Sequence, residues 1–219
     1  MIAGPTEPVR TLLFIRHAES RIDPGSPPHE WTLTDEGREG AARIAPMLKR
    51  FTPGRLLVSP EPKAVETARV LGTQLDLDIE RLAGLCEQDR TGVPFFGTQE
   101  EFERYVAEVL ESPTTRLLGP ESAEEAYKRF SVEVEDALRR HQEDCLAFVA
   151  HGTVMSLFVG RRAGIEPYEL WRRLGMPSYL AVSWPEGRLI EALFEPAGAV
   201  VNMDAWPPVE GECERERSR

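Results

Sequence analysis

The sequence is poor in cysteine and in long apolar segments, and each shortage excludes a class of protein. Its three cysteines, Cys86, Cys145 and Cys213, have no short repeated spacing, which excludes a disulfide framework and a zinc knuckle. No apolar stretch is long enough to span a membrane, and the first ten residues lack the apolar core of a signal peptide. We therefore expect a cytoplasmic protein with no membrane partner.

Basic residues are also scarce. The chain has 26 Lys and Arg against 37 Asp and Glu, and its formal net charge is −11. A nucleic-acid partner is disfavoured, because binding to a phosphate backbone needs a basic surface. A small anionic substrate is still compatible with this charge, because a local cationic pocket can form within an acidic protein.

The remaining composition is that of an ordinary globular chain of 219 residues, with 41% hydrophobic and 29% charged residues. We predict one catalytic domain over residues 1–205, with an insertion at about 88–120, and a charged tail over 206–219. Phe95, Phe96 and Tyr105 of the insertion form either its own small core or an apolar wall over a leaving group.

Short apolar runs alternate with amphipathic segments along the chain, which predicts an α/β fold. We expect a three-layer α/β/α sandwich with a mostly parallel, mixed sheet and the helical insertion over the sheet edge. The expected strands are Thr11–Ile15, Arg55–Val58, Asp78–Leu82 at an edge, Cys145–Ala150, and a hairpin of Tyr179–Trp184 and Arg188–Phe194. Helices are expected after Thr34 as N-cap, from Ser59-Pro60, and over Gln99–Leu110, Ser122–His141, Thr153–Ala163 and Pro167–Leu174.

Two histidines follow two of these apolar strands. His17 comes after the first strand with Arg16 directly before it, and His151 follows Cys145–Ala150. Ligands of open α/β sheets bind at the carboxyl ends of the strands, so both imidazoles should reach the same edge. Imidazoles beside a guanidinium suit a phosphate better than a metal ion.

Phosphoryl transfer gives each of these groups a chemical role. A neutral imidazole is a good nucleophile toward phosphorus, and the planar fork of Arg16 suits the phosphoryl oxygens. Lys63 lies near a helix N-terminus, which itself attracts anions, and Glu87 could protonate a leaving alkoxide. Taken singly, a lysine at a helix start or a glutamate on a loop indicates only an exposed side chain.

Six segments, in order, resemble motifs of the histidine phosphatase superfamily, which includes the cofactor-dependent phosphoglycerate mutases. Each segment alone is a weak signal, but their order over most of the chain is specific. The segments are Arg16-His17-Ala18-Glu19-Ser20, Leu33-Thr34-Asp35-Glu36-Gly37, Ser59-Pro60 with Lys63-Ala64-Val65-Glu66-Thr67-Ala68, Leu85-Cys86-Glu87, Gly119-Pro120-Glu121-Ser122 and Ala150-His151-Gly152.

This resemblance implies a histidine acid-type phosphatase that acts on a small phosphorylated substrate. His17 would become phosphohistidine, and Glu87 would act as general acid and then as base. Arg16, Lys63 and His151 would bind the phosphoryl oxygens. The resemblance implies no metal and no cofactor.

The chain departs from the family pattern at three positions. Ala18 replaces the usual glycine, and Lys63 replaces an arginine, which keeps the charge but loses the bidentate fork. Asp23 lies where many members have asparagine, and a carboxylate beside the phosphate would weaken anion binding unless it recognised a hydroxyl or amine. We count Asp23 and Ser20 as candidate substrate contacts.

Two other functions stay open. A mutase would need added basic residues over the pocket, and the insertion offers Arg90 and Arg104 but is acidic overall. A phospho-ligand-binding protein with weak catalysis is the alternative from another class. Cys86 meets Arg90 two residues too soon for a thiol phosphatase, and His29 and His141 lack metal-ligand spacing. The oligomeric state is open, and a homodimer is compatible with the sequence.

Overall fold

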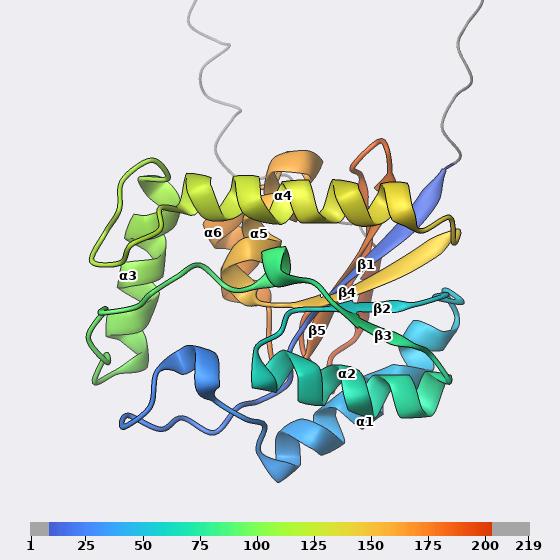
Figure 1. Ribbon diagram of the computed structural model, residues 1–219, viewed down its shortest axis with the longest axis horizontal. Coiled ribbons are helices and arrows are strands. Elements are labelled where there is room, and N and C mark those ends of the chain that lie inside the picture. Colours follow the sequence, from blue (N-terminus) through green and yellow to red (C-terminus); the bar gives the residue numbers. More distant parts are fainter. Residues whose placement is uncertain (1–8, 203–219) are drawn as a thin grey trace, which may run out of the picture.

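The computed structural model describes residues 9–202, and within them seven strands form one mixed sheet (Figure 1). The strand order is β3-β2-β4-β1-β5-β6-β7, in which β1 to β4 are parallel neighbours and β5, β6 and β7 pair antiparallel. The strands are β1 (Arg10–Arg16), β2 (Leu56–Val58), β3 (Ile79–Arg81), β4 (Cys145–Ala150), β5 (Ser178–Trp184), β6 (Leu189–Leu193) and β7 (Val200–Asn202). The predicted mostly parallel, mixed sheet is confirmed.

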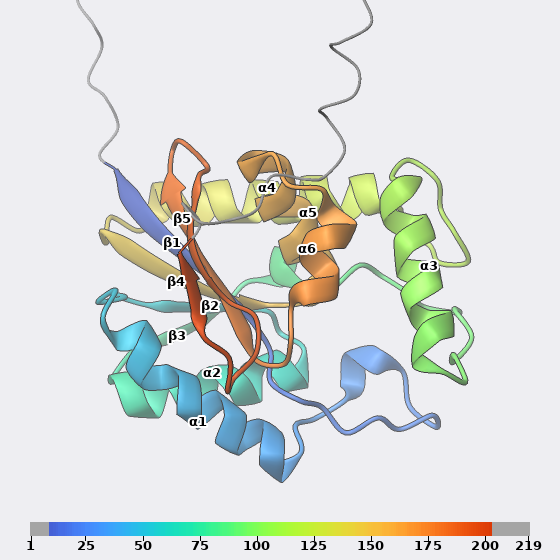
Figure 2. The ribbon, with the colours of Figure 1, turned by 180° about the vertical axis from the view of Figure 1, so that it is seen from behind.

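Helices cover both faces of this sheet, as Figures 1 and 2 show. One layer contains α1 and α2, and the other contains α4, α5 and α6. The helices are α1 (Asp35–Lys49), α2 (Pro62–Leu75), α3 (Gln99–Glu111), α4 (Ala123–Arg140), α5 (Gly152–Ala163) and α6 (Pro167–Arg173), with short 3-10 turns at Pro28–Glu30 and Ala83–Leu85. No helix within residues 9–202 is long and apolar enough to cross a membrane.

Side chains of the central strands alternate between two hydrophobic cores, one on each face of the sheet. Successive side chains of a strand point to opposite faces of the sheet. Leu13 and Ile15 of β1 therefore pack with α1 and α2, while Leu12 and Phe14 pack with α4 and α5. Both faces of β1 are buried, which explains why its sequence is a continuous apolar run.

Side-chain caps fix where most helices begin. Thr34 caps α1 by accepting a hydrogen bond from the Gly37 amide at 2.9 Å, as predicted. The prediction that a helix begins at Ser59-Pro60 is wrong, because α2 begins at Pro62. A proline disfavours helical geometry in the residue before it, so Glu61 stays extended with ψ 136° and becomes the N-cap.

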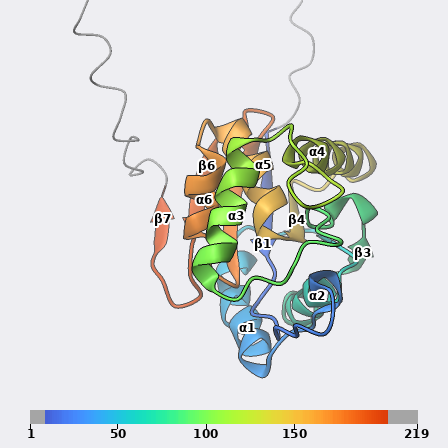
Figure 3. The ribbon, with the colours of Figure 1, turned by 90° about the vertical axis from the view of Figure 1, so that its left-hand side faces the viewer.

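The insertion adds α3 beyond the carboxyl ends of β1 and β4, in front of α5 and α6 (Figures 1 and 3). Phe96 and Tyr105 pack together with ring centroids 5.0 Å apart, and Phe102 meets Trp171 of α6 at 5.8 Å. Phe96 and Tyr105 therefore belong to the small core of the insertion, whereas Phe95 is 52% exposed.

One strand was not predicted, and one predicted segment lies outside the described residues. The analysis missed β7, a strand of only three residues that pairs with β6. The predicted tail, 206–219, and Cys213 lie outside the described residues.

Candidate active site

The two strand-end histidines lie next to each other in the structure, with their rings tilted by 59°. β1 and β4 are adjacent and parallel with Arg16 opposite Ala150, and the His17 amide donates to the Ala150 carbonyl at 3.0 Å. The ring centroids of His17 and His151 are 5.2 Å apart, and both side chains are buried. The parallel register thus brings together two residues that are far apart in the chain.

The backbone fixes the tautomer of His17. Its Nδ1 lies 2.8 Å from the carbonyl oxygen of Ala18, and a carbonyl can only accept, so Nδ1 carries the proton. Burial lowers the pKa of His17 well below 6.5, and His151, Lys63 and Arg16 lower it further. The ring is therefore neutral near pH 7, with a lone pair on Nε2.

His151 has one bonded and one unbonded ring nitrogen. Its Nε2 lies 2.8 Å from the Ser59 hydroxyl and 3.3 Å from Oε1 of Glu61. Its Nδ1 is buried without a hydrogen-bond partner among residues 9–202. Burial lowers the pKa of His151 well below 6.5, with a further contribution from Lys63, and Glu87 only partly opposes this shift. If the Ser59 hydroxyl donates to Nε2, the proton of the neutral ring lies on Nδ1.

The carboxylate of Glu87, from the loop after Ala83–Leu85, lies at the N-terminus of α5. Its Oε1 accepts from the amides of Gln88 at 2.9 Å and Val154 at 3.2 Å, and its Oε2 accepts from Thr153 at 3.1 Å. Burial by itself would raise the pKa of Glu87, but His151, Arg90 and these amides lower it below its ordinary value. The carboxylate is thus ionised at neutral pH, which suits a base and requires an added negative charge before it can serve as an acid.

A residue that the sequence analysis missed holds the Glu87 segment in place. Arg129 of α4 donates to the carbonyls of Cys86 at 2.9 Å and Glu87 at 3.1 Å, and it pairs with Glu121 at 2.8 Å. No local pattern identifies this role of Arg129, because the two carbonyls that it holds lie 43 and 42 residues earlier in the chain.

Arg16 approaches the start of α5 closely. One terminal nitrogen donates to the Leu174 carbonyl, and its Nε is buried without a hydrogen-bond partner within residues 9–202. A Cβ on Gly152 would lie 3.2 Å from the guanidinium carbon, so a glycine favours this approach. Burial lowers the pKa of Arg16 to about 10, and Glu87 raises it while Arg90 lowers it. The guanidinium stays charged at neutral pH.

Lys63 was expected to be an unpaired cation of the phosphate pocket, but in the structure it pairs with an acidic residue. Its ammonium lies 2.7 Å from Oε2 of Glu61 and 2.6 Å from the Pro28 carbonyl, and the Lys63 and Glu61 residues are 4% and 7% exposed. The other oxygen of Glu61 accepts from the Glu87 amide at 2.8 Å. The sequence analysis missed Glu61, although its place two residues before Lys63 was a usable signal.

The two candidate substrate contacts lie on the loop after β1. Asp23 is exposed and uses its Oδ1 to accept from the Gly25 amide at 2.9 Å. Ser20 forms an isolated antiparallel bridge with Leu33 and is partly buried. Neither position decides whether the residue meets a substrate, and both contacts remain predictions.

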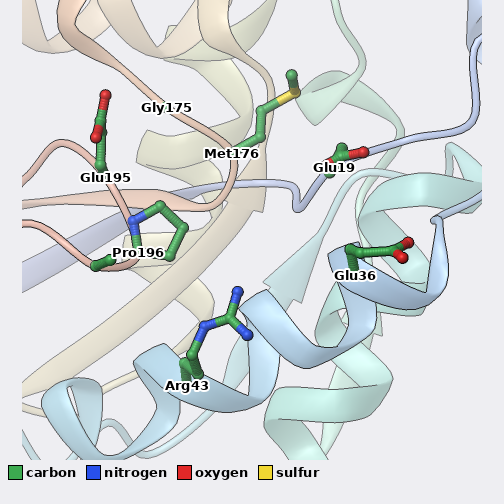
Figure 4. Close-up of a pocket in the computed structure, with 8 residues that line it drawn as sticks. Glu19, Glu36, Arg43, Gly175, Met176, Glu195 and Pro196 are labelled. Atoms are coloured by element: carbon green, nitrogen blue, oxygen red, sulfur yellow. The ribbon is translucent and has the colours of Figure 1, made fainter.

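Other polar groups lie outside this site. His29 is exposed, and His141 pairs with Glu80 at 2.9 Å. Within the described part of the chain, no group of three or more His, Cys, Asp and Glu side chains is arranged to hold a metal ion. An open pocket near α1, shown in Figure 4, contains none of the predicted site residues, and its acidic lining does not suit a phosphate. Glu19, Glu36, Arg43, Gly175, Met176, Glu195, Pro196 and Ala197 line it.

The depressed pKa values of His17 and His151 predict a pH-dependent stability. Below about pH 6.5 the unfolded chain takes up protons at both histidines while the folded chain does not, so stability is lost as the pH falls. We expect the free energy of unfolding to fall between about pH 6.5 and 5, with a limiting slope of about 1.4 kcal/mol per pH unit for each histidine. Urea unfolding at a series of pH values measures this slope. The H17Q variant should show about half of it, and an equal slope in H17Q and wild type would contradict the assignment.

The sequence and the fold of this chain are similar to those of known proteins. Residues 12–190 match the model of the histidine phosphatase superfamily (branch 1), and no curated protein matches the chain. The fold is similar to that of a mycobacterial glucosyl-3-phosphoglycerate phosphatase, with a TM-score of 0.67, 20% identity, and 80% of this chain and 91% of that chain covered. For mycobacterial hydrolase 2 these values are 0.68, 19%, 90% and 94%. For a phosphoserine phosphatase of Entamoeba histolytica they are 0.61, 18%, 83% and 94%. At these identities, the structural likeness concerns the fold.

Proposed function

Because this chain belongs to the histidine phosphatase superfamily, branch 1, we propose that it hydrolyses a small phosphomonoester through a phosphohistidine on His17. One observation carries the proposal. The Ala18 carbonyl holds the proton of His17 on Nδ1, and burial keeps the ring neutral, so Nε2 offers a lone pair for attack. This is a histidine acid-type phosphatase mechanism in which no step requires a metal.

In the first half-reaction, Nε2 of His17 attacks phosphorus and the bond to the leaving oxygen breaks. Glu87 protonates that oxygen, after the charge of the bound phosphoryl group has raised its pKa. The Nε of Arg16 and the Nδ1 of His151, both buried without hydrogen-bond partners within residues 9–202, bind the phosphoryl oxygens. In the second half-reaction, Glu87 takes a proton from water, the water oxygen attacks phosphorus, and inorganic phosphate leaves with His17 restored.

The names of two structural neighbours indicate the size of the substrate. One neighbour is a glucosyl-3-phosphoglycerate phosphatase and another is a phosphoserine phosphatase. We extend to this chain only the class that they share, a small phosphorylated molecule. Asp23 and Ser20 remain candidates for contact with its leaving group.

The contacts of Lys63 favour a second candidate function. Because Glu61 balances the Lys63 charge, the pocket has one free cation fewer than the sequence analysis expected. A protein that binds a phosphorylated ligand and turns it over slowly, or not at all, would be compatible with this balance. A mutase is an alternative only if the phosphoenzyme is retained and returned to a bound substrate.

Trapping the phosphoenzyme tests the proposal. The wild-type protein is mixed with p-nitrophenyl phosphate, with and without a chelator, then quenched in alkali and analysed by intact mass. We expect one added phosphoryl group on wild type, none on H17A, and hydrolysis that the chelator leaves unchanged. Chelator-sensitive hydrolysis that survives in H17A would overturn the mechanism. Binding of inorganic phosphate without hydrolysis of a phosphomonoester panel would support the second candidate instead.

A further inference from the structure

Arg90, in the insertion, has a half-buried guanidinium that lacks a polar partner. Its guanidinium carbon lies 5.1 Å from the centre of the Phe102 ring, over the face of that ring. Within residues 9–202, Arg90 forms no ion pair, and its side chain donates no hydrogen bond. A half-buried guanidinium that stacks on a ring keeps its N–H donors free for water or for an anionic ligand.

Two aromatic rings link Arg90 to the place where Arg16 packs. The Phe102 ring under Arg90 packs against Trp171 with centroids 5.8 Å apart. A Cβ on Gly152 would lie 3.1 Å from Nε1 of Trp171 and 3.2 Å from Nε of Arg16. Phe102 and Trp171 thus connect Arg90 to the start of α5, where Arg16 also packs.

Arg90 acts electrostatically on Arg16, His151 and Glu87, and Lys63 acts on the two histidines. Burial lowers the pKa values of Arg16 and His151, and Arg90 lowers both further. The pKa of Glu87 falls below its usual value despite its burial, and Arg90 contributes to that shift after His151. Two guanidinium groups that repel each other beside an imidazole form a site that an anion would stabilise.

The backbone around Arg90 is held in place. The Asp89 amide donates to Oε2 of Glu121 at 2.8 Å, and the side chain of Gln88 donates to the Glu121 carbonyl at 2.9 Å. A Cβ on Gly119 would lie 2.8 Å from the Asp89 carbonyl oxygen, so a glycine is needed where the two loops cross. Arg90 therefore extends from an anchored loop.

Lys63, in contrast, already has partners in the structure. Its ammonium is bound by the Glu61 carboxylate and the Pro28 carbonyl, and the pair as a whole carries no net charge. An arginine also offers a planar fork for two phosphoryl oxygens, which an ammonium lacks. We propose that Arg90, rather than Lys63, supplies the second pocket guanidinium and binds the phosphoryl oxygens together with Arg16.

This inference rests on the proposed function, but it can be tested without turnover. Calorimetry measures the Kd of inorganic phosphate at fixed ionic strength for wild type, R90Q, R90K and the double variant E61L/K63M. R104Q is the matched control, since Arg104 is an exposed arginine of the same insertion. Thermal unfolding of each variant shows that it is folded.

We expect R90Q to weaken phosphate binding about tenfold or more, because it removes charge-assisted hydrogen bonds. R90K should bind with an intermediate Kd, R104Q should match wild type, and E61L/K63M should lose less affinity than R90Q. Unchanged binding by R90Q, or a loss in E61L/K63M equal to or larger than that in R90Q, would overturn the inference. This inference and the proposed function can fail separately. If R90Q binds phosphate normally while wild type forms phosphohistidine, only the inference about Arg90 is refuted. Conversely, Arg90-dependent phosphate binding by a wild type that forms no phosphohistidine would refute only the phosphatase.

Discussion

Replacing His17 by alanine is expected to lower kcat for phosphomonoester hydrolysis by about 10⁴-fold or more, as loss of a nucleophile does in covalent catalysis. The size of the effect follows from the geometry. Nε2 of His17 carries the lone pair, and the only other imidazole at the site has its Nε2 at 2.8 Å from Ser59. No neighbouring group of the site is therefore placed to take over the attack. Steady-state kinetics with p-nitrophenyl phosphate measure the loss.

The control for this variant is H29A, because His29 is exposed and outside the site. H29A should keep the wild-type kcat. H17A should still bind inorganic phosphate, because the arginines remain. A kcat for H17A close to that of wild type would show that another group carries the phosphoryl transfer.

Replacing Glu61 by leucine is expected to lower the free energy of unfolding by about 3–5 kcal/mol, the range seen when one partner of a buried ion pair is removed. The change leaves the ammonium of Lys63 buried, with the Pro28 carbonyl as its remaining hydrogen-bond partner within residues 9–202. It also removes the acceptor of the Glu87 amide, at 2.8 Å. Urea unfolding at pH 7 measures the loss.

The double variant E61L/K63M separates the charge effect from a packing effect. Removing both charges leaves no buried ion unpaired, so we expect most of the lost stability to return. If E61L/K63M is as unstable as E61L alone, the loss comes from the hydrogen bonds of Glu61 to the Glu87 segment and His151, and the ion pair contributes little.

Local sequence patterns were sufficient to predict most of the fold. The apolar run of β1 and the turn Pro185-Glu186-Gly187 of the β5–β6 hairpin place those strands within one residue of their observed bounds. Thr34 marks the start of α1 because a hydroxyl N-cap acts on amides only a few residues away. The start of α2 was misplaced because Ser59-Pro60 resembles a helix start, while Pro62 decides the geometry.

The sequence by itself determined the position of the two histidines and of Arg16. Each follows from a buried parallel strand that ends at the carboxyl edge of the sheet, and that signal is contained in a few consecutive residues. The family motifs added the roles proposed for Glu87 and Lys63. These are properties of short segments, so no long-range contact was needed to find them.

Only the tertiary structure decided the charges around the phosphoryl site. Glu61 contacts Lys63 two residues away, at the start of α2. It also contacts the Glu87 amide, 26 residues later, and His151 at the start of α5. Arg90 acts on the charge of Arg16 because α3 packs on α6, through Phe102 and Trp171. Whether a cation is free or balanced depends on which carboxylates fold against it, and the spacing of residues along the chain does not contain that information.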